Sequence, residues 1–273
     1  MFDAILAQVR SRSPLVHCIT NYVTANDCAN IVLACGASPV MADDAGEVAE
    51  ITARSAGLSL NLGTLNQGKI TSLLLAGQTA NRLSKPVLLD PVGVGASRLR
   101  TKTALLLLDT IHLAVIRANA SEMKALSLGC ETQRGVDAGV CDRITEETLD
   151  RSVAFCKAFS RQTGAVISMT GPIDIVANGE RAFCIRNGHE MMSAVTGTGC
   201  QLSVLTAAFV AANPDKPLEA AAAAVCAMGL AGQIAHARLR PLDGSGSYRT
   251  YLIDAIFNLT PDQLEKGAKY ELR

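Results

Sequence analysis

The sequence has no excess of either charge, because 25 lysine and arginine residues are matched by 25 aspartate and glutamate residues among its 273 positions. Nucleic acids and anionic membranes are bound by basic surfaces, so neither is an expected partner. No apolar run approaches the ~20 residues that a membrane-spanning helix needs. The first ten residues carry an acid, Asp3, where a signal peptide has its basic region, and they are predicted to form a short amphipathic helix instead.

The nine cysteines include no CxxC pair. An odd number of cysteines spread through apolar segments is typical of free thiols in a reducing compartment and not of a disulfide framework. We therefore expect a cytoplasmic protein in which most cysteines are small buried hydrophobic residues. The four histidines lack metal-ligand spacing and no GxSxG motif occurs, which disfavours a zinc site and a serine hydrolase.

Short apolar segments alternate with helical patterns over most of the chain. Apolar strands separated by helices predict an α/β fold of three layers, with a mainly parallel central sheet and helices on both of its faces. Two later segments joined by Asn178-Gly179-Glu180 are predicted to form a β-hairpin, and the chain after Gly199 is predicted to be wholly helical. No linker or repeat interrupts the sequence, so residues 1–273 are expected to form a single domain. The predicted strands are Leu15–Ile19, Leu58–Leu62, Pro86–Leu89, Ala114–Ile116, Ala165–Met169, Ile173–Ala177 and Ala182–Ile185, and the predicted helices include Thr71–Leu83, Thr101–Thr110, Glu147–Gln162, Leu202–Ala212, Leu218–Arg238 and Tyr248–Asn258.

The most informative segment is Thr196-Gly197-Thr198-Gly199-Cys200, which directly precedes an apolar helical run. Two glycines one residue apart let the backbone turn sharply and present its N–H groups. A helix N-terminus binds anions, because its unpaired N–H groups and its dipole both face the ligand. Gly197, Thr198, Gly199 and Cys200 are therefore expected to form an anion hole for a phosphate. The positive potential there should lower the pKa of the Cys200 thiol and place a reactive group at the point of attack.

Two glycine-containing segments follow predicted strands, at the sheet edge where α/β folds bind ligands. Asp90 precedes a GxG pair and suits a metal ion or its bound water, although a turn or helix-capping role is an equal alternative. The GxG pair lacks the third glycine of the dinucleotide fingerprint, so NAD binding is weakly supported. The segment from Gly63 to Ile70 has Walker A spacing, but Ile70 replaces the hydroxyl residue that binds Mg²⁺, so we do not expect a phosphate loop there.

Polar residues also follow the other predicted strands. Asn119 and Glu122 have the spacing of a capping box. Glu122 can in addition help to bind Mg²⁺, while the guanidinium of Arg117 suits a phosphate. Thr170 adds a hydroxyl at the next strand end. Further candidates, which are predicted to line a second pocket for an acceptor substrate, are Asn21, Met41 and the run from Asn61 to Thr64.

Taken together, these motifs resemble the hydroxyethylthiazole kinases, a family of thiamine-salvage enzymes in the ribokinase-like superfamily. The resemblance extends over nearly the whole chain. Its seven motifs, in order, are Ser13–Asn21, Gly36–Met41, Asn61–Thr64, Asp90–Ala96, Asn119–Glu122, Gly135–Asp137 and Thr196–Cys200.

The resemblance implies transfer of the γ-phosphate of ATP to the primary alcohol of 4-methyl-5-(2-hydroxyethyl)thiazole, with Mg²⁺ as the cofactor. It also implies a homotrimer whose thiazole pockets are shared between neighbouring subunits. The residues that it assigns are Arg117 and Thr170 to ATP, Asn21, Met41, Gly63 and Gly197 to the thiazole, and Asp90 and Glu122 to Mg²⁺, partly through water.

Cys200 stands where most ribokinase-like enzymes place an aspartate that takes the proton of the acceptor hydroxyl. Its thiol is therefore the candidate general base, and the alternative is that Cys200 only shapes the loop. Two departures from the family pattern concern backbone geometry, namely Ala118 in place of glycine and Ser245 in place of proline. A hydroxymethylpyrimidine kinase of the same fold and a sensing protein without catalysis remain as alternatives.

Overall fold

The computed structural model describes residues 1–134 and 144–273, with side chains described for residues 1–129 and 144–273. Its framework is a nine-stranded sheet in the order β2-β1-β3-β4-β5-β6-β7-β8-β9. The strands are β1 (Leu15–Ile19), β2 (Ser38–Val40), β3 (Gly57–Asn61), β4 (Val87–Asp90), β5 (Val115–Asn119), β6 (Val166–Thr170), β7 (Asp174–Ala177), β8 (Ala182–Ile185) and β9 (Tyr270–Leu272). The helices are α1 (Phe2–Arg12), α2 (Ala25–Ala34), α3 (Val48–Arg54), α4 (Gln67–Arg82), α5 (Arg98–Thr110), α6 (Ala120–Arg134), α7 (Leu149–Thr163), α8 (Thr198–Ala212), α9 (Pro217–Ala237), α10 (Ser245–Asn258) and α11 (Pro261–Gly267), with 3₁₀ turns at Glu146–Thr148 and Glu190–Ala194.

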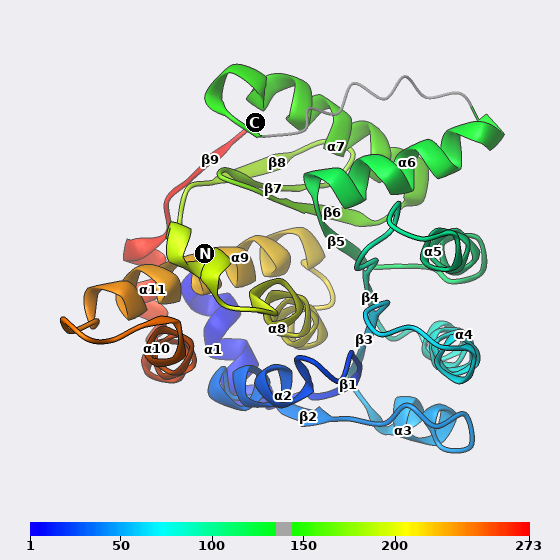
Figure 1. Cartoon of the computed structure of the whole chain (residues 1–273), viewed down its shortest axis with the longest axis horizontal. Coiled ribbons are helices and arrows are strands. Elements are labelled where there is room, and N and C mark those ends of the chain that lie inside the picture. Colours follow the sequence, from blue (N-terminus) through cyan, green and yellow to red (C-terminus); the bar gives the residue numbers. More distant parts are fainter. Residues whose placement is uncertain (135–143) are drawn as a thin grey trace.

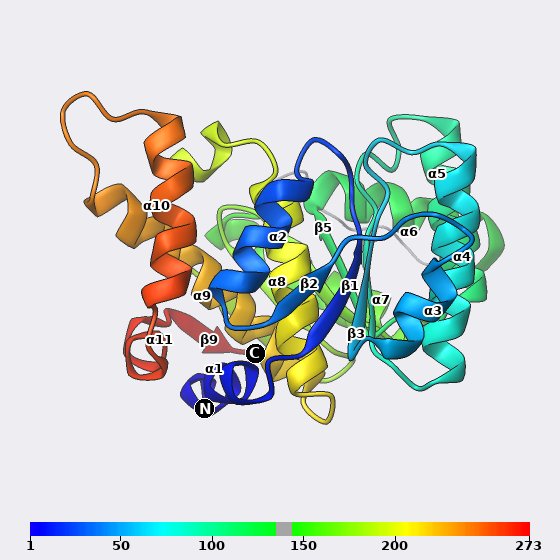
Figure 2. The same cartoon turned by 90° about the horizontal axis from the view of Figure 1, so that it is seen from below.

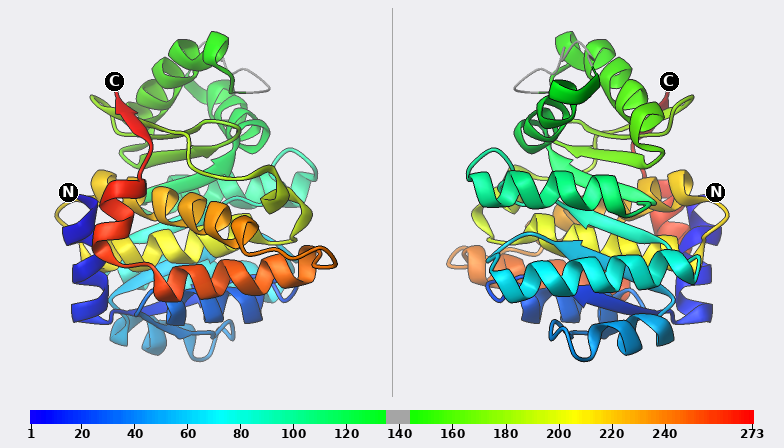
Figure 3. Two further views of the ribbon diagram at one scale, coloured as in Figure 1. Left: turned by 90° about the vertical axis from the view of Figure 1, so that its left-hand side faces the viewer. Right: turned by 90° about the vertical axis from the view of Figure 1, so that its right-hand side faces the viewer.

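Strands β1 to β6 pair in parallel, whereas β7, β8 and β9 pair antiparallel. Helices α3 to α6 lie on one side of the sheet, and α1, α2, α8, α9, α10 and α11 lie on the other (Figure 1). The same two groups of helices are seen separately when the sheet is viewed from its two sides (Figure 3). The predicted three-layer fold with a mainly parallel sheet is confirmed.

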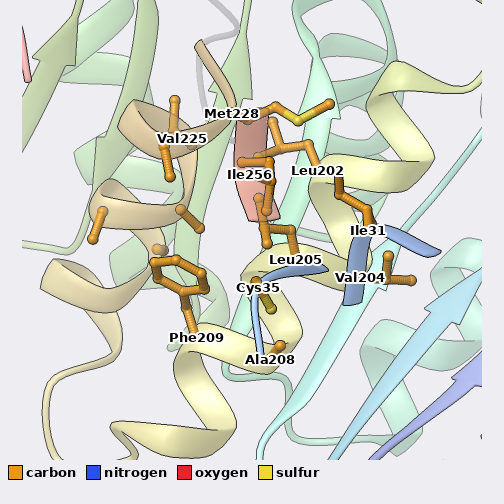
Figure 4. Close-up of a cluster of buried hydrophobic side chains, with 14 of the residues drawn as sticks. Ile31, Cys35, Leu202, Val204, Leu205, Ala208, Phe209, Val225, Met228 and Ile256 are labelled. Atoms are coloured by element: carbon orange, nitrogen blue, oxygen red, sulfur yellow. The ribbon is translucent and has the colours of Figure 1, made fainter. Parts of the chain in front are cut away.

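Each face of the sheet buries its own hydrophobic core. The larger core is centred on α8, which runs along β1, β3 and β4 and lies between α2, α9 and the strands (Figure 2). Leu205 and Phe209 of α8 point into a cluster with Val225 of α9 and Ile256 of α10 (Figure 4). A helix that is apolar on all sides is typical of a core element, so α8 is held firmly and its N-terminus is fixed in position.

Helix α9 corrects one expectation from the sequence. Its 21 residues are long and apolar enough, by length and composition, to cross a membrane, whereas no such segment was expected. Of its most apolar window, 78% is buried inside the protein. Packing against α8 and α10 therefore accounts for its composition (Figure 2).

The strand predictions were correct in position to within one residue at each end, apart from β5, which continues to Asn119. Strands β2 and β9 were missed, and the expectation that the chain is wholly helical after Gly199 is wrong, because β9 pairs with β8. Both missed strands have three residues and incomplete burial, so no apolar run marks them.

Helix α8 begins at Thr198, four residues before the predicted start, because the glycine-containing segment forms its first turn.

The parallel strands end in polar residues at one edge of the sheet. Asn61 at the end of β3 is in register with Asp90 at the end of β4. Asn119 at the end of β5 is likewise in register with Thr170 at the end of β6. Because parallel strands point the same way, these side chains lie along a single edge, as expected for a ligand site in an open α/β sheet.

Candidate functional site

The N-terminus of α8 closes against this polar edge. Gly197 is its N-cap, with φ of 81°, a backbone conformation that glycine adopts without strain. A Cβ atom on Gly197 would lie 2.2 Å from Thr24 Cγ2, and one on Gly199 would lie 2.5 Å from Arg117 Nη1. The first helical hydrogen bond is donated by Gln201 N–H to the Gly197 carbonyl, at 2.9 Å. The preceding N–H groups have no acceptor within the helix, as the predicted anion hole requires.

A cavity of about 640 Å³ lies on one side of this helix end. The two residues expected to contact ATP, Arg117 and Thr170, both line it, together with Thr198 and Gly199 of the helix. Arg117 is held in place by a hydrogen bond of 2.8 Å from Nη2 to Thr170 Oγ1. The sequence-predicted phosphate-binding residues therefore come together in one cavity.

A second cavity, of about 220 Å³, is lined by Asn21 and Met41, as predicted for the acceptor pocket. Gly63 is not among its lining residues but packs against Asn21, since a Cβ atom on Gly63 would lie 2.8 Å from the Asn21 side chain. Gly197 packs in the same way against Thr24, whose hydroxyl donates to Asn21 Oδ1 at 3.1 Å. Both glycines thus pack closely against residues next to the cavity and do not line it themselves.

The Cys200 thiol lies between the two cavities at the centre of a polar network. Its Sγ accepts hydrogen bonds of 3.3 Å from the side-chain amides of both Asn21 and Asn61. Asn61 also donates to Asp90 Oδ2 at 2.9 Å, and Arg117 Nη1 lies 4.0 Å from that same oxygen. A continuous chain of polar contacts therefore runs from the smaller cavity, through the thiol, to the guanidinium in the larger one.

The expected lowering of the Cys200 pKa is wrong. Burial raises the pKa of this thiol, the Asp90 carboxylate raises it further, and hydrogen bonds from Asn61, Thr24 and Asn21 oppose the increase. The prediction placed Cys200 at the open mouth of a loop. It lies instead in the first turn of a buried helix, with 9% of its surface exposed.

Asp90 is fully buried, and this burial raises its carboxyl pKa to about 6, with Arg117 as the largest opposing influence. Its Oδ2 also accepts a hydrogen bond of 2.7 Å from Ser203 Oγ. Its Oδ1 has no hydrogen-bond partner among the described residues. The helix-capping alternative for Asp90 is wrong, because Ser97 caps the helix that follows.

Glu122 does form the predicted capping box. The Glu122 N–H donates to Asn119 Oδ1 at 2.9 Å, and the Asn119 N–H donates to Glu122 Oε2 at 3.2 Å. Its other carboxylate oxygen accepts from Gly93 N–H at 2.8 Å. Glu122 therefore joins the loop after Asp90 to the start of α6. Gly93, the first glycine of the GxG pair, holds the Glu122 carboxylate in position through its N–H group.

The carboxylates of Asp90 and Glu122 are the candidates for holding the Mg²⁺ that the resemblance implies. Within residues 1–134 and 144–273 there is no group of three or more His, Cys, Asp or Glu side chains that could hold a metal. Mg²⁺ in kinase sites is held by one or two carboxylates together with substrate phosphates and water. Oδ1 of Asp90 has no hydrogen-bond partner among the described residues, and the charge of Glu122 raises the pKa of Asp90. An unpaired carboxylate oxygen with a second carboxylate nearby fits that arrangement.

Several site residues were not singled out from the sequence. Ser203 lies three residues after Cys200 on the same face of α8, a spacing that would have pointed to it had the helix start been known. Asp174 lines the larger cavity, accepts a hydrogen bond of 2.9 Å from Gly171 N–H, and has its pKa raised to about 7 by burial. Lys69 lines the smaller cavity. Its Nζ donates hydrogen bonds to the backbone carbonyls of Thr20 and Gly63, at 2.6 and 2.8 Å.

The structure also shows where the cysteines and the two departures from the family pattern lie. The cysteines whose side chains are described are free and buried, as predicted. Ala118 lies fully buried within regular β5, and Ser245 is the first residue of α10, so neither departure disturbs the local backbone. The motif from Gly135 to Asp137 lies outside the described residues.

Residues 6–262 match the model of the hydroxyethylthiazole kinase family. A hydroxyethylthiazole kinase of Clostridium acetobutylicum is 57% identical over 271 residues, which cover 99% of each chain. The solved hydroxyethylthiazole kinase of Pyrococcus horikoshii superposes with a TM-score of 0.88 at 34% identity, covering 100% of this chain and 98% of that one. A ribokinase-like superfamily protein of Enterococcus faecalis, at 15% identity and a TM-score of 0.60 over 97% and 95% of the two chains, shares the fold alone.

The chain is a kinase that phosphorylates an alcohol, and its three-layer fold is shared with ribokinase-like proteins. Among these proteins, the chain belongs to the hydroxyethylthiazole kinase family. The resemblance drawn from the seven motifs is therefore confirmed.

Proposed function

We propose that this protein transfers the γ-phosphate of ATP to the hydroxyl of 4-methyl-5-(2-hydroxyethyl)thiazole, in thiamine biosynthesis or salvage. The observation that carries the proposal is the polar network through Cys200, which connects the two cavities beside one helix N-terminus. Phosphoryl transfer depends on positioning and charge stabilisation more than on covalent chemistry. A rigid anion site between a donor cavity and an acceptor cavity is suited to that task.

The larger cavity is assigned to ATP. Arg117, oriented by Thr170, contacts the phosphates, and the N–H groups from Gly197 to Cys200 face the transferred group. Asp90 and Glu122 would hold Mg²⁺, partly through water, and the ion when bound neutralises phosphate charge. Arg117 interacts with Asp90 as well, so the residue that binds phosphate also helps to keep this buried carboxyl ionised.

The smaller cavity is assigned to the thiazole, with Met41 on its wall and Asn21 next to Cys200. Cys200 accepts the proton of the attacking hydroxyl. Because burial keeps its pKa above the ordinary value, the thiol must first lose its own proton, so the reactive form is a minor species at neutral pH.

The assembly is proposed to be a homotrimer with shared acceptor pockets, located in the cytoplasm. Three apolar side chains around the smaller cavity are exposed in the single chain, namely Tyr22 (81%), Val23 (59%) and Met41 (38%). Apolar exposure beside a binding cavity supports contact with a neighbouring subunit there. One sheet runs from Leu15 to Leu272, which supports a single domain over residues 1–273.

The function is tested by ADP release in a coupled assay with Mg-ATP. The thiazole alcohol should be phosphorylated in preference to hydroxymethylpyrimidine and simple short alcohols. Turnover of the pyrimidine alone would reassign the substrate. Tight binding of ATP and thiazole without ADP release would show a sensing protein and exclude the kinase proposal.

A further inference from the structure

Lys69 places a buried ammonium group in the wall of the smaller cavity. The residue is 4% exposed, and its Nζ donates to the carbonyl oxygens of Thr20 at 2.6 Å and Gly63 at 2.8 Å. It lies in the first turn of α4, where Asn66 caps the helix and accepts from the Lys69 N–H at 2.9 Å. A lysine buried this deeply is rare and requires specific partners.

The two carbonyls belong to the two loops that form the acceptor site. Thr20 immediately precedes Asn21, and Gly63 follows Asn61 by two residues; these asparagines are the amides that contact the Cys200 thiol. The second loop is strained, because Thr64 has φ of 47°, and such strain persists only where the surroundings hold the backbone. Lys69 therefore ties together the loops that position the two asparagines.

An ammonium group has three N–H donors. Two are taken by the carbonyls, which leaves one for the cavity that Lys69 lines. The rest of that cavity includes apolar groups, among them Cys18, Ala25 and Met41, which suit a neutral ring. In 4-methyl-5-(2-hydroxyethyl)thiazole the ring nitrogen is on the side of the ring opposite the hydroxyethyl substituent. When the hydroxyl lies at Cys200, the nitrogen is the acceptor left to pair with a donor in the cavity wall.

We propose that Lys69 is a specificity-determining residue, whose third N–H donates a hydrogen bond to the ring nitrogen of the acceptor substrate. The inference rests on the proposed function and extends it by naming the group that distinguishes a nitrogen-containing ring from an otherwise similar apolar ring.

Titration of Lys69 separates this role from a purely structural one. Burial lowers its pKa to about 8; the Asp43 carboxylate and Cys200 oppose this lowering, and Arg100 adds to it. A neutral amine retains two N–H donors, which is enough for both carbonyls, but it presents a lone pair where the third N–H was. Above about pH 8 the loops should therefore remain tied while the bond to the ring nitrogen is lost.

The experiment compares the thiazole alcohol with 2-(3-methylthiophen-2-yl)ethanol, which keeps the ring shape, the methyl group and the hydroxyethyl chain but replaces the ring nitrogen with CH. The wild-type enzyme should prefer the thiazole in kcat/KM by roughly ten- to a hundredfold, the effect of one hydrogen bond to a charged group. Lys69→Met should lose most of this preference while leaving the KM for Mg-ATP unchanged. Lys85→Met is the matched control, because Lys85 Nζ also donates to two carbonyls, those of Ala53 and Ser55, without lining this cavity.

A second measurement needs no variant. In the wild-type enzyme, the KM for the thiazole should rise between about pH 7.5 and 9, whereas the KM for the thiophene should stay flat. Retention of the preference in Lys69→Met, or a thiazole KM that is flat through pH 8, would overturn the role of Lys69 and leave the kinase function intact. Failure of the wild-type enzyme to phosphorylate either alcohol would overturn both proposals.

Discussion

At the scale of single residues, Cys200 carries the most specific expectation. If its thiol takes the hydroxyl proton, Cys200→Ala should reduce kcat by ~10²–10⁴, the usual contribution of a general base. Cys200→Ser should behave like the alanine variant, because a hydroxyl is too weak an acid to supply the basic form. Cys200→Asp should match or exceed the parent, since a carboxylate is already ionised at neutral pH. Steady-state kinetics of the three variants measure this, with the KM for Mg-ATP as a check on folding. Parental rates in both the serine and alanine variants would leave Cys200 a purely loop-shaping residue.

The same thiol predicts a pH dependence. Burial and Asp90 raise the Cys200 pKa, so the thiolate is a minor species at neutral pH and its fraction grows about tenfold for each pH unit below that pKa. The kcat of the wild-type enzyme should therefore increase from pH 6.5 to 9 without a plateau. In Cys200→Asp the profile should be flat over this range, since the carboxylate titrates far below it. A flat wild-type profile would argue against a proton-accepting thiol. This increase with pH is expected in kcat, whereas titration of Lys69 is expected to change the KM for the thiazole. The two effects can therefore be measured separately.

Several residues that the structure brings together at the two cavities could be named from the sequence. Asn21, Arg117 and Thr170 follow apolar strands in the sequence, and the parallel sheet brings strand ends together. The state of Cys200 was not predictable, because its pKa depends on burial and on Asp90, which lies 110 positions away. Lys69 was also missed as a residue that lines the smaller cavity. In the sequence, Lys69 was noticed only as part of a segment with Walker A spacing. Its hydrogen-bond partners are the backbone carbonyls of Thr20 and Gly63, and no side-chain motif indicates such partners.

At the scale of elements, the junction before α8 holds the site together. Gly197→Ala would place a methyl group 2.2 Å from Thr24 Cγ2 at a positive φ, and strain of this kind costs ~1–3 kcal/mol. We expect a lower melting temperature and a higher KM for the thiazole, since Thr24 supports Asn21. Gly246→Ala in α10 is the control, because nothing lies within 4 Å of its added methyl group, and its stability should be unchanged or slightly higher. Equal behaviour of the two variants would mean that the close approach at Gly197 does not matter.

The limits of prediction at this scale have a physical basis. Long apolar strands such as β3 are recognisable because both faces of the sheet are covered. The three residues of β9 form a strand only because β8 offers an edge to pair with, 85 or more positions earlier in the chain. The start of α8 was misplaced for a related reason: glycine and threonine have low helix propensity, and tertiary packing overrides it.

At the scale of the whole molecule, two hydrophobic cores on opposite faces hold the sheet, and the site lies where α8 meets the sheet edge. The N-terminus is tied to α11, because the N-terminal amine of Met1 pairs with Glu265 of that helix at 2.9 Å. The larger cavity is lined by residues from many elements of one chain. The smaller cavity differs, because two of its lining residues, Tyr22 and Met41, are exposed apolar side chains. The proposed assembly would cover these side chains.

The proposed homotrimer can be tested in solution. Light scattering should yield three times the 28.6 kDa chain mass. Replacing both Tyr22 and Val23 with aspartate should dissociate the trimer, because charge would be introduced into an apolar contact. The same variant should raise the KM for the thiazole and leave that for Mg-ATP nearly unchanged, because in the proposed trimer a neighbouring subunit completes only the smaller cavity. Leu242→Asp is the control, since Leu242 is fully exposed but remote from this cavity in sequence and is not among its lining residues. A wild-type monomer with full activity would contradict the shared pocket, since each chain would then hold a complete acceptor site.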